Sequence, residues 1–140
     1  MIKHVKIMGV KMHKKKILIV DDEKDALFVL EKELAGRGYS VISADNGSDA
    51  INLAKSQYPD LIILDIWMPG MDGPEVAAKL GEDPKTEDIP VIFLTCLFQK
   101  REGEEQGRVV AGKVLIAKPY SIEGLSDQIE KLINWQCVHR

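Results

Sequence analysis

The stretch that decides the fold is Asp60-Leu-Ile-Ile-Leu-Asp65-Ile-Trp-Met-Pro69-Gly70-Met-Asp72-Gly73. Residues 61–64 form an unbroken apolar run of strand length, which is typical of a central strand buried on both faces. That run ends on Asp65, and ligands bind at the carboxyl ends of the strands in open α/β sheets. Pro69 and Gly70 indicate a stiff loop after the strand, because both are chosen for backbone geometry. Asp65 is therefore the first candidate for a functional side chain.

Short apolar runs alternate with helical patterns along the rest of the chain. The predicted strands cover residues 17–20, 40–44, 61–64, 91–95 and 114–117, and the predicted helices cover 23–37, 47–56, 73–80 and 123–135. Asp72 and Ser121 are predicted to cap the helices that follow them. Residues 99–112 are rich in charge and interrupted by glycine, so a helix there would be marginal and mobile. The alternation predicts one α/β domain, a doubly wound parallel sheet with helices on both faces.

The composition indicates a soluble globular protein of one domain. Its 140 residues are 45% hydrophobic and 29% charged, which is ordinary for such a domain. There is no apolar run near the roughly 18–20 residues that a membrane span needs. The amino-terminal segment also lacks the apolar core of a secretory signal. We expect a cytoplasmic protein with reduced cysteines and no membrane partner.

The net charge is unevenly distributed. Residues 1–16 contain six lysines and no acid, which leaves −9 for the other residues, because the whole chain carries −3. The acidic body argues against direct binding of nucleic acid. Residues 1–13 are predicted to form a loosely attached basic extension containing a short strand or flap. Residues 14–136 then form the domain, and 137–140 form a tail.

Five polar side chains meet at one edge of the predicted sheet. They follow the ends of four strands, and they are Asp21, Asp22, Asp65, Thr95 and Lys118. Carboxylates this close repel one another unless a cation is bound, and a hard divalent ion such as Mg²⁺ prefers oxygen ligands. An anion that suits Mg²⁺, an ammonium and a hydroxyl together is a phosphoryl group. The carboxylate on the central strand is then the candidate nucleophile.

The chain from about Lys14 to Trp135 resembles a response-regulator receiver domain, the phosphoacceptor module of two-component signalling. The resemblance rests on four motifs in the family's order, which are ILIVDDE (17–23), LIILDIWMPGMDG (61–73), PVIFLT (90–95) and AKPY (117–120). Each motif alone is weak, but four in order at strand ends are specific. The resemblance implies a five-stranded, flavodoxin-like (βα)5 fold with strand order 2-1-3-4-5.

The resemblance also implies a magnesium site. Asp65 corresponds to the phosphorylated aspartate, Asp22 to the direct Mg²⁺ ligand, and Asp21 to the ligand that acts through water. The backbone carbonyl of Trp67 would complete the site.

The remaining family positions concern the phosphoryl group and the signal. Thr95 corresponds to the switch hydroxyl, and Lys118 to the ion-pair partner of the phosphoryl group, followed by a cis bond to Pro119. A sensor histidine kinase or a phosphotransfer protein would be the donor. The output would be a downstream protein bound at the face of the fourth helix, fifth strand and fifth helix. We expect a monomer or a weak homodimer.

The chain departs from the family pattern at two positions, and the interval from Thr95 to Lys118 is about one residue longer than usual. Leu115 stands where many receivers carry a Tyr or Phe that rotates with the switch threonine. Cys96 replaces a small residue after Thr95 and is interpreted as a slightly larger residue at the edge of the core.

In the family, the positions of Trp67 and Leu97 border the path of the water that hydrolyses the aspartyl phosphate. Two apolar side chains there would not orient that water, so we expect a long-lived phosphorylated state. The alternative is that Trp67 only covers the loop or contacts a partner.

Two other function classes share some of these sequence features. An aspartyl phosphatase of the haloacid dehalogenase type is rejected, because it needs a second Asp where Trp67 stands and a cap insertion. A receiver-like docking module that acts without phosphorylation stays open because of Leu115. We expect no turnover of an external substrate, only self-phosphorylation and autodephosphorylation. We also expect a stand-alone regulator with no output domain, with a receiver fragment of a larger regulator as the alternative.

Overall fold

The structure is a computed structural model, and it describes residues 4–7, 10–96, 108–110 and 113–139. The strands are β1 (His4–Ile7), β2 (Val10–His13), β3 (Lys16–Val20), β4 (Ser40–Ala44), β5 (Leu61–Asp65), β6 (Val91–Thr95), β7 (Arg108–Val110) and β8 (Lys113–Ala117). The helices are α1 (Lys24–Gly36), α2 (Gly47–Gln57), α3 (Gly73–Gly81) and α4 (Ile122–His139). Each predicted strand and each of the four firmly predicted helices is present within a few residues of its expected bounds.

The main sheet has the strand order β4-β3-β5-β6-β8-β7. The pairs β3·β4, β3·β5, β5·β6 and β6·β8 are parallel, so the predicted order 2-1-3-4-5 of five parallel strands is confirmed. Strand β7 pairs antiparallel with β8 and extends the sheet by one strand that was not predicted. The edge strands are β4 on one side and β7 on the other.

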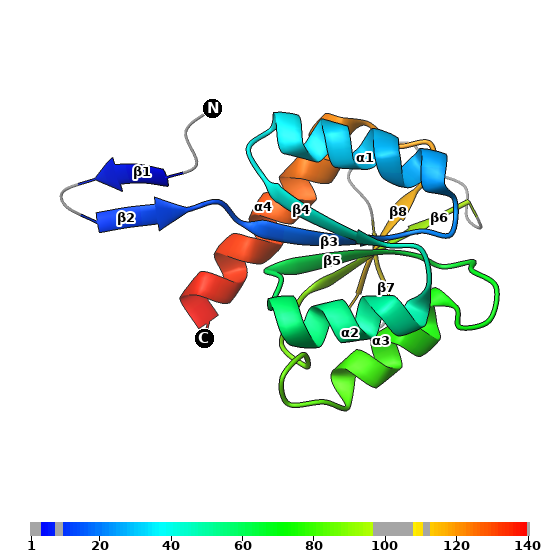
Figure 1. Cartoon of the computed structure of the whole chain (residues 1–140). Coiled ribbons are helices and arrows are strands. Elements are labelled where there is room, and N and C mark those ends of the chain that lie inside the picture. The colour runs from blue at the N-terminus through cyan, green and yellow to red at the C-terminus, as the bar shows by residue number, and fades with distance from the viewer. Residues whose placement is uncertain (1–3, 8–9, 97–107, 111–112, 140) are drawn as a thin grey trace.

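Helices cover both faces of the sheet, as predicted. In Figure 1, α1 and α4 lie on one face, and α2 and α3 on the other. Alternate residues of β3 and β5 serve the two faces: Ile17 and Ile63 pack in the core cluster under α1 and α4, and Leu18 and Ile62 pack in the one under α2 and α3. Burial of each such side chain stabilises the fold by about 1.5–3 kcal/mol. The carboxyl ends of five strands are thereby held in a fixed arrangement.

The helix ends follow the predicted capping residues. Asp72 Oδ1 accepts from the Glu75 N–H at 2.9 Å, and Ser121 Oγ accepts from the Gly124 N–H at 3.0 Å. Helix α4 continues to His139, beyond the predicted end at Trp135, while its inner face is the predicted one, with Leu125 buried. Among the described helices, none combines the length and apolar content that crossing a bilayer requires.

Two segments with weak sequence signals differ from a simple alternation. Strands β1 and β2 form a separate antiparallel hairpin in the basic extension, where the sequence suggested only a short strand or flap. The possible helix over 99–112 falls mostly outside the described residues. The part that is described, Arg108–Val110, is strand β7.

Candidate functional site

Asp65 is the last residue of the central strand β5, which lies between β3 and β6. The four preceding residues of the strand are buried, and the Asp65 side chain is 13% exposed. The Ile66 N–H donates to the Leu94 carbonyl at 3.1 Å, so the chain stays attached to β6 as it leaves the strand. The carboxylate therefore lies in a fixed position at the carboxyl end of the sheet, and its side chain is partly accessible to a ligand.

Asp21 and Asp22 directly follow strand β3 and lie beside Asp65. One carboxylate oxygen from each of the three side chains lies within 4.8 Å of the others. Two hydrogen bonds fix Asp21. Its N–H donates to the Ala44 carbonyl at 3.2 Å, and its Oδ1 accepts from the Glu23 N–H at 2.9 Å. Asp22 is exposed at the mouth of the site.

Lys118 closes the site from the end of strand β8. Its Nζ lies 3.3 Å from Asp21 Oδ2 and 3.5 Å from Asp65 Oδ1, and its side chain is 26% exposed. The peptide bond between Lys118 and Pro119 is cis, as the resemblance implies. One ammonium therefore bridges two of the three carboxylates, which leaves the cluster with an excess of negative charge.

This crowding of charges shifts the pKa values of Asp65 and Lys118. Burial, with the nearby charges of Asp21 and Asp22, raises the pKa of the Asp65 carboxyl, although Lys118 opposes the shift. Burial alone would lower the pKa of the Lys118 ammonium, but Asp21 and Asp65 outweigh it, so this pKa lies above its usual value. Lys118 is therefore positively charged, and a bound cation would stabilise the ionised carboxylate of Asp65.

Thr95 ends strand β6 beside these residues. It is buried, at 1% exposure, and it is the register partner of Ala117, the residue before Lys118. Its carbonyl accepts from the Lys118 N–H at 2.8 Å, which ties the two strand ends together.

The departures from the family pattern fall around the site. The Trp67 side chain is 62% exposed on the loop after β5, and Cys96 is an exposed free cysteine. Leu115 is half-buried on β8 and packs against the cluster under α2 and α3. Leu97, the second residue of the water-path hypothesis, lies outside the described residues.

Gly73 supports the loop that carries these groups. A Cβ on Gly73 would lie 2.5 Å from the Asp65 carbonyl oxygen and 3.0 Å from the Ile66 Cα, and the Gly73 N–H donates to the Ile66 carbonyl at 2.9 Å. The return of the chain past Asp65 therefore requires the absence of a side chain at this position.

We expect Gly73→Ala to destabilise the fold by about 1–3 kcal/mol, because backbone atoms of the Asp65 loop must move. The matched control is Gly81→Ala at the other end of α3, where an added Cβ meets nothing within 4 Å. This control should be neutral or stabilising by up to about 1 kcal/mol. Urea unfolding of the two variants measures the difference, and equal free energies of unfolding would contradict the steric argument.

The donor set suits a hard divalent cation. Around Mg²⁺, oxygens about 2.1 Å from the ion lie within roughly 4.2 Å of each other. One oxygen from each of the Asp21, Asp22 and Asp65 carboxylates already lies within 4.8 Å of the other two, so at most a slight closure is needed. The structure thus brings Asp21, Asp22, Asp65 and Lys118 into one cluster with Thr95 on the adjacent strand. All five were predicted from the sequence.

Comparisons with known proteins agree with this geometry. Residues 17–130 match the family model described as the response regulator receiver domain. A "Probable transcriptional regulator ycf27" of Porphyridium aerugineum is 36% identical over 122 residues, which are 87% of this chain and 49% of that protein. The response regulator PleD of Caulobacter vibrioides is 36% identical over 123 residues, 88% of this chain and 27% of that protein. The chain therefore spans half or less of these relatives.

A solved structure shows the same fold with an ion in its cleft. The receiver domain of the sensor histidine kinase PA1611 from Pseudomonas aeruginosa PAO1 superposes with a TM-score of 0.75 at 26% identity. The match covers 86% of this chain and 98% of that domain, which is described with a magnesium ion coordinated in its active site cleft.

Proposed function

Because this chain belongs to the response-regulator receiver family, we propose that it accepts a phosphoryl group on Asp65 and signals through protein–protein contacts. The observation that carries the proposal is the position of Asp65: on the central strand, 3.5 Å from the Lys118 ammonium and next to two further carboxylates. Asp65 is the only carboxylate of the cluster that ends the central strand. It is therefore the nucleophile, and Asp21 and Asp22 serve only as cation ligands.

The transfer uses a nearby cation and the described side chains in separate roles. Asp21, Asp22, Asp65 and the backbone carbonyl of Trp67 would hold Mg²⁺, which supplies charge neutralisation for the incoming phosphoryl oxygens. A carboxylate oxygen of Asp65 attacks phosphorus as the P–N bond of a phosphohistidine breaks and its imidazole leaves. The Lys118 ammonium then exchanges part of its contact with Asp65 for a phosphoryl oxygen.

The switch follows from the added charge. Phosphorylation places new acceptor oxygens beside Lys118 and near Thr95, the last residue of β6. The hydroxyl of Thr95 turns toward the phosphoryl group and moves the start of the segment after β6. The downstream partner binds at the face that includes β8 and α4. The expected interface also included a helix over residues 99–112, most of which lie outside the described residues.

Mapping of the modified residue tests this proposal. The protein is phosphorylated with a small-molecule phosphodonor and Mg²⁺, and the acyl phosphate is reduced with borohydride, which converts a phosphorylated aspartate to homoserine. Peptide mass spectrometry should place homoserine at position 65. Homoserine at Asp21 or Asp22, with residue 65 unchanged, would contradict the assignment.

The water-path hypothesis gives a second measurable result. We expect Trp67→Asn to increase the rate constant of dephosphorylation about tenfold, because a polar side chain can orient the attacking water where an indole cannot. Trp135→Asn is the matched control, since Trp135 is 57% exposed on α4, away from the strand ends. The decay of the adduct is followed by intact mass, and an unchanged rate in Trp67→Asn would assign this indole a covering role only.

A further inference from the structure

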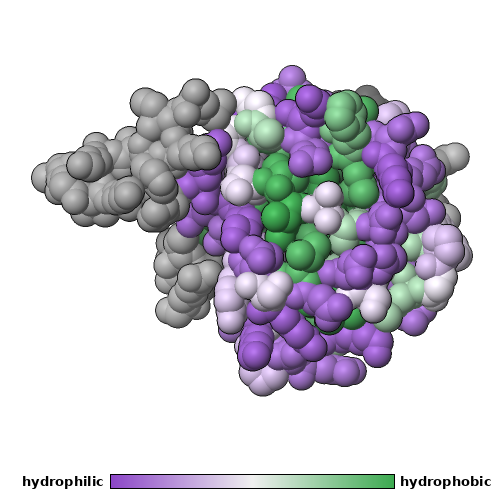
Figure 2. Space-filling model, viewed as in Figure 1, coloured by the Kyte–Doolittle hydropathy of each residue, from purple (hydrophilic) through white to green (hydrophobic). Residues whose placement is uncertain are grey.

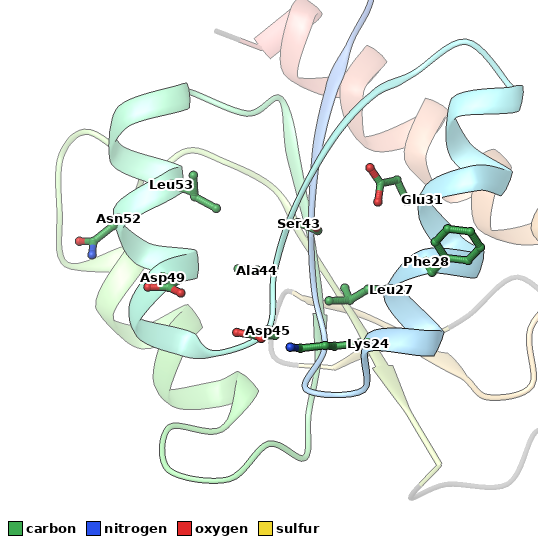
Figure 3. A pocket seen from close by; sticks show the side chains of 10 residues that line it. All are labelled: Lys24, Leu27, Phe28, Glu31, Ser43, Ala44, Asp45, Asp49, Asn52 and Leu53. Carbon is green, nitrogen blue, oxygen red and sulfur yellow. The ribbon is translucent and has the colours of Figure 1, made fainter.

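The surface has a groove at the edge of the sheet formed by β4, opposite the edge formed by β7. A cavity of about 630 Å³ opens between α1 and α2, and the carboxyl end of β4 contributes to its lining. Figure 3 shows Leu27 and Leu53 extending into this space from the two helices, with Ala44 of β4 between them. Phe28 stands beside the groove on α1, 60% exposed. Figure 2 shows the same region as hydrophobic surface surrounded by hydrophilic side chains.

The strand beneath the groove has an open backbone edge. Strand β4 ends the sheet, and its pairing with β3 uses the Ser40 N–H, which donates to the Lys15 carbonyl, and the Ala44 carbonyl, which accepts from the Asp21 N–H. Backbone groups alternate sides along a strand, so the N–H and C=O of Val41 and Ser43 face outward. A row of outward backbone groups beside apolar side chains is a template for another strand.

The border of the groove is acidic. Three carboxylates, those of Glu31, Asp45 and Asp49, line it together with one ammonium, that of Lys24. Asp45 and Asp49 are held near each other by the Asn46 side chain, whose Nδ2 donates to Asp45 Oδ1 at 2.8 Å and to Asp49 Oδ2 at 2.9 Å. A strand with apolar and basic residues would complement both the floor and the border.

The β1–β2 hairpin of this chain has that chemistry. Its register pairs Val5 with Met12 and Ile7 with Val10, and the alternate pairs are His4 with His13 and Lys6 with Lys11. One set of register positions is therefore apolar and the other basic. A lone two-stranded hairpin is at best marginally stable in water, so a partner surface is expected.

The chain's own groove is poorly placed for its own hairpin. Only residues 14 and 15 connect β2 to β3, and Figure 1 shows the hairpin beyond the amino end of β3, away from α1 and α2. The cavity is lined by Ser43, Ala44 and Asp45, at the other end of the neighbouring parallel strand. Because this short connection holds the hairpin beyond the amino end of β3, docking onto another molecule is favoured over docking onto the chain's own groove.

We propose that the β1–β2 hairpin of one copy docks on the groove between α1 and α2 of a second copy, adding a strand beside β4. The arrangement is reciprocal, so a two-fold dimer buries two hairpins and two open edges. Asp65, on the central strand, is not among the residues that line the groove. The proposal does not rest on phosphorylation of Asp65.

Charge reversal on each side tests the proposal with the full chain. The hairpin variant is Lys6→Glu with Lys11→Glu, the groove variant is Glu31→Lys with Asp49→Lys, and a third protein combines all four changes. A control with the same change in charge as the hairpin variant is Lys79→Glu with Lys85→Glu, two exposed residues outside the groove. Sedimentation equilibrium at low salt measures the dimer dissociation constant of each.

We expect each reversed side alone to raise the dissociation constant at least about tenfold, the combined protein to recover most of the loss, and the control to match wild type. Circular dichroism and urea unfolding show whether the variants keep the fold. A wild-type chain that stays monomeric at millimolar concentration overturns the proposal. So does a folded hairpin variant with the wild-type dissociation constant, or a failure of the four changes to restore dimerisation.

Discussion

Lys118→Met is expected to lower the free energy of unfolding by about 2–3 kcal/mol at neutral pH in the absence of divalent ions. The substitution leaves Asp21 and Asp65 without the ammonium that lies 3.3 and 3.5 Å from them, while Asp22 remains close. A partly buried charge that loses its partner is costly, and here three carboxylates face one another. Urea unfolding with a chelator present measures this loss.

Mg²⁺ gives this prediction its control. Binding of the ion replaces the missing positive charge, so saturating Mg²⁺ should stabilise Lys118→Met more than it stabilises the wild type. The surface variant Lys55→Met removes another lysine that pairs with a carboxylate, with Nζ 3.2 Å from Asp83 Oδ2, but outside the cluster. It should show a smaller loss and no special response to Mg²⁺. Equal behaviour of the two variants would contradict the central role of Lys118.

Asp65→Asn is expected to have the opposite effect on stability. Because the pKa of Asp65 is raised in the folded state, the native protein binds a proton more tightly than the unfolded chain. Stability therefore falls as pH rises from the ordinary aspartate pKa through the folded value, and at neutral pH the ionised carboxylate is unfavourable. The neutral amide removes that repulsion, so without metal the variant should be more stable than the wild type at pH 7.

The same variant should respond weakly to magnesium. At a Mg²⁺ concentration one hundred times the dissociation constant, the wild type gains about 2.7 kcal/mol, and Asp65→Asn, with one ligand less, should gain clearly less. Asp83→Asn is the matched control, because hydrogen bonds from the Lys85 N–H and Lys55 lower the pKa of Asp83. That control should lose stability at neutral pH. Melting temperatures measured from pH 4 to 8, with chelator or Mg²⁺, distinguish the two signs.

The site could be predicted from the sequence because its residues stand at element boundaries. Asp65 and Thr95 each end an apolar run that can only be a buried parallel strand, and Lys118 follows another. Once the alternation of strand and helix is recognised, the sheet places these ends together without any knowledge of side-chain packing. The pairing of Lys118 with Asp21 as well as Asp65 needed the structure, since it depends on side-chain reach.

The two unpredicted strand features have a different origin. Strand β7 has three residues, and its only described ladder is with β8, so its formation depends on a tertiary contact that local propensity does not report. The hairpin of β1 and β2 does alternate apolar and polar residues, but each strand has only four. Short strands of this kind are weak signals until their pairing is seen. The groove beside β4 likewise appears only when α1 and α2 are placed in space.

The central claim is that Asp65 is the phosphoacceptor, and one measurement tests it most directly. Intact-mass spectrometry follows wild type and Asp65→Asn after incubation with a small-molecule phosphodonor, with Mg²⁺ or with chelator. We predict one added phosphoryl group on the wild type with Mg²⁺, and none with chelator or in Asp65→Asn. An adduct of equal yield in Asp65→Asn, or no wild-type adduct despite measured Mg²⁺ binding, would contradict the account and favour a docking module that works without phosphorylation.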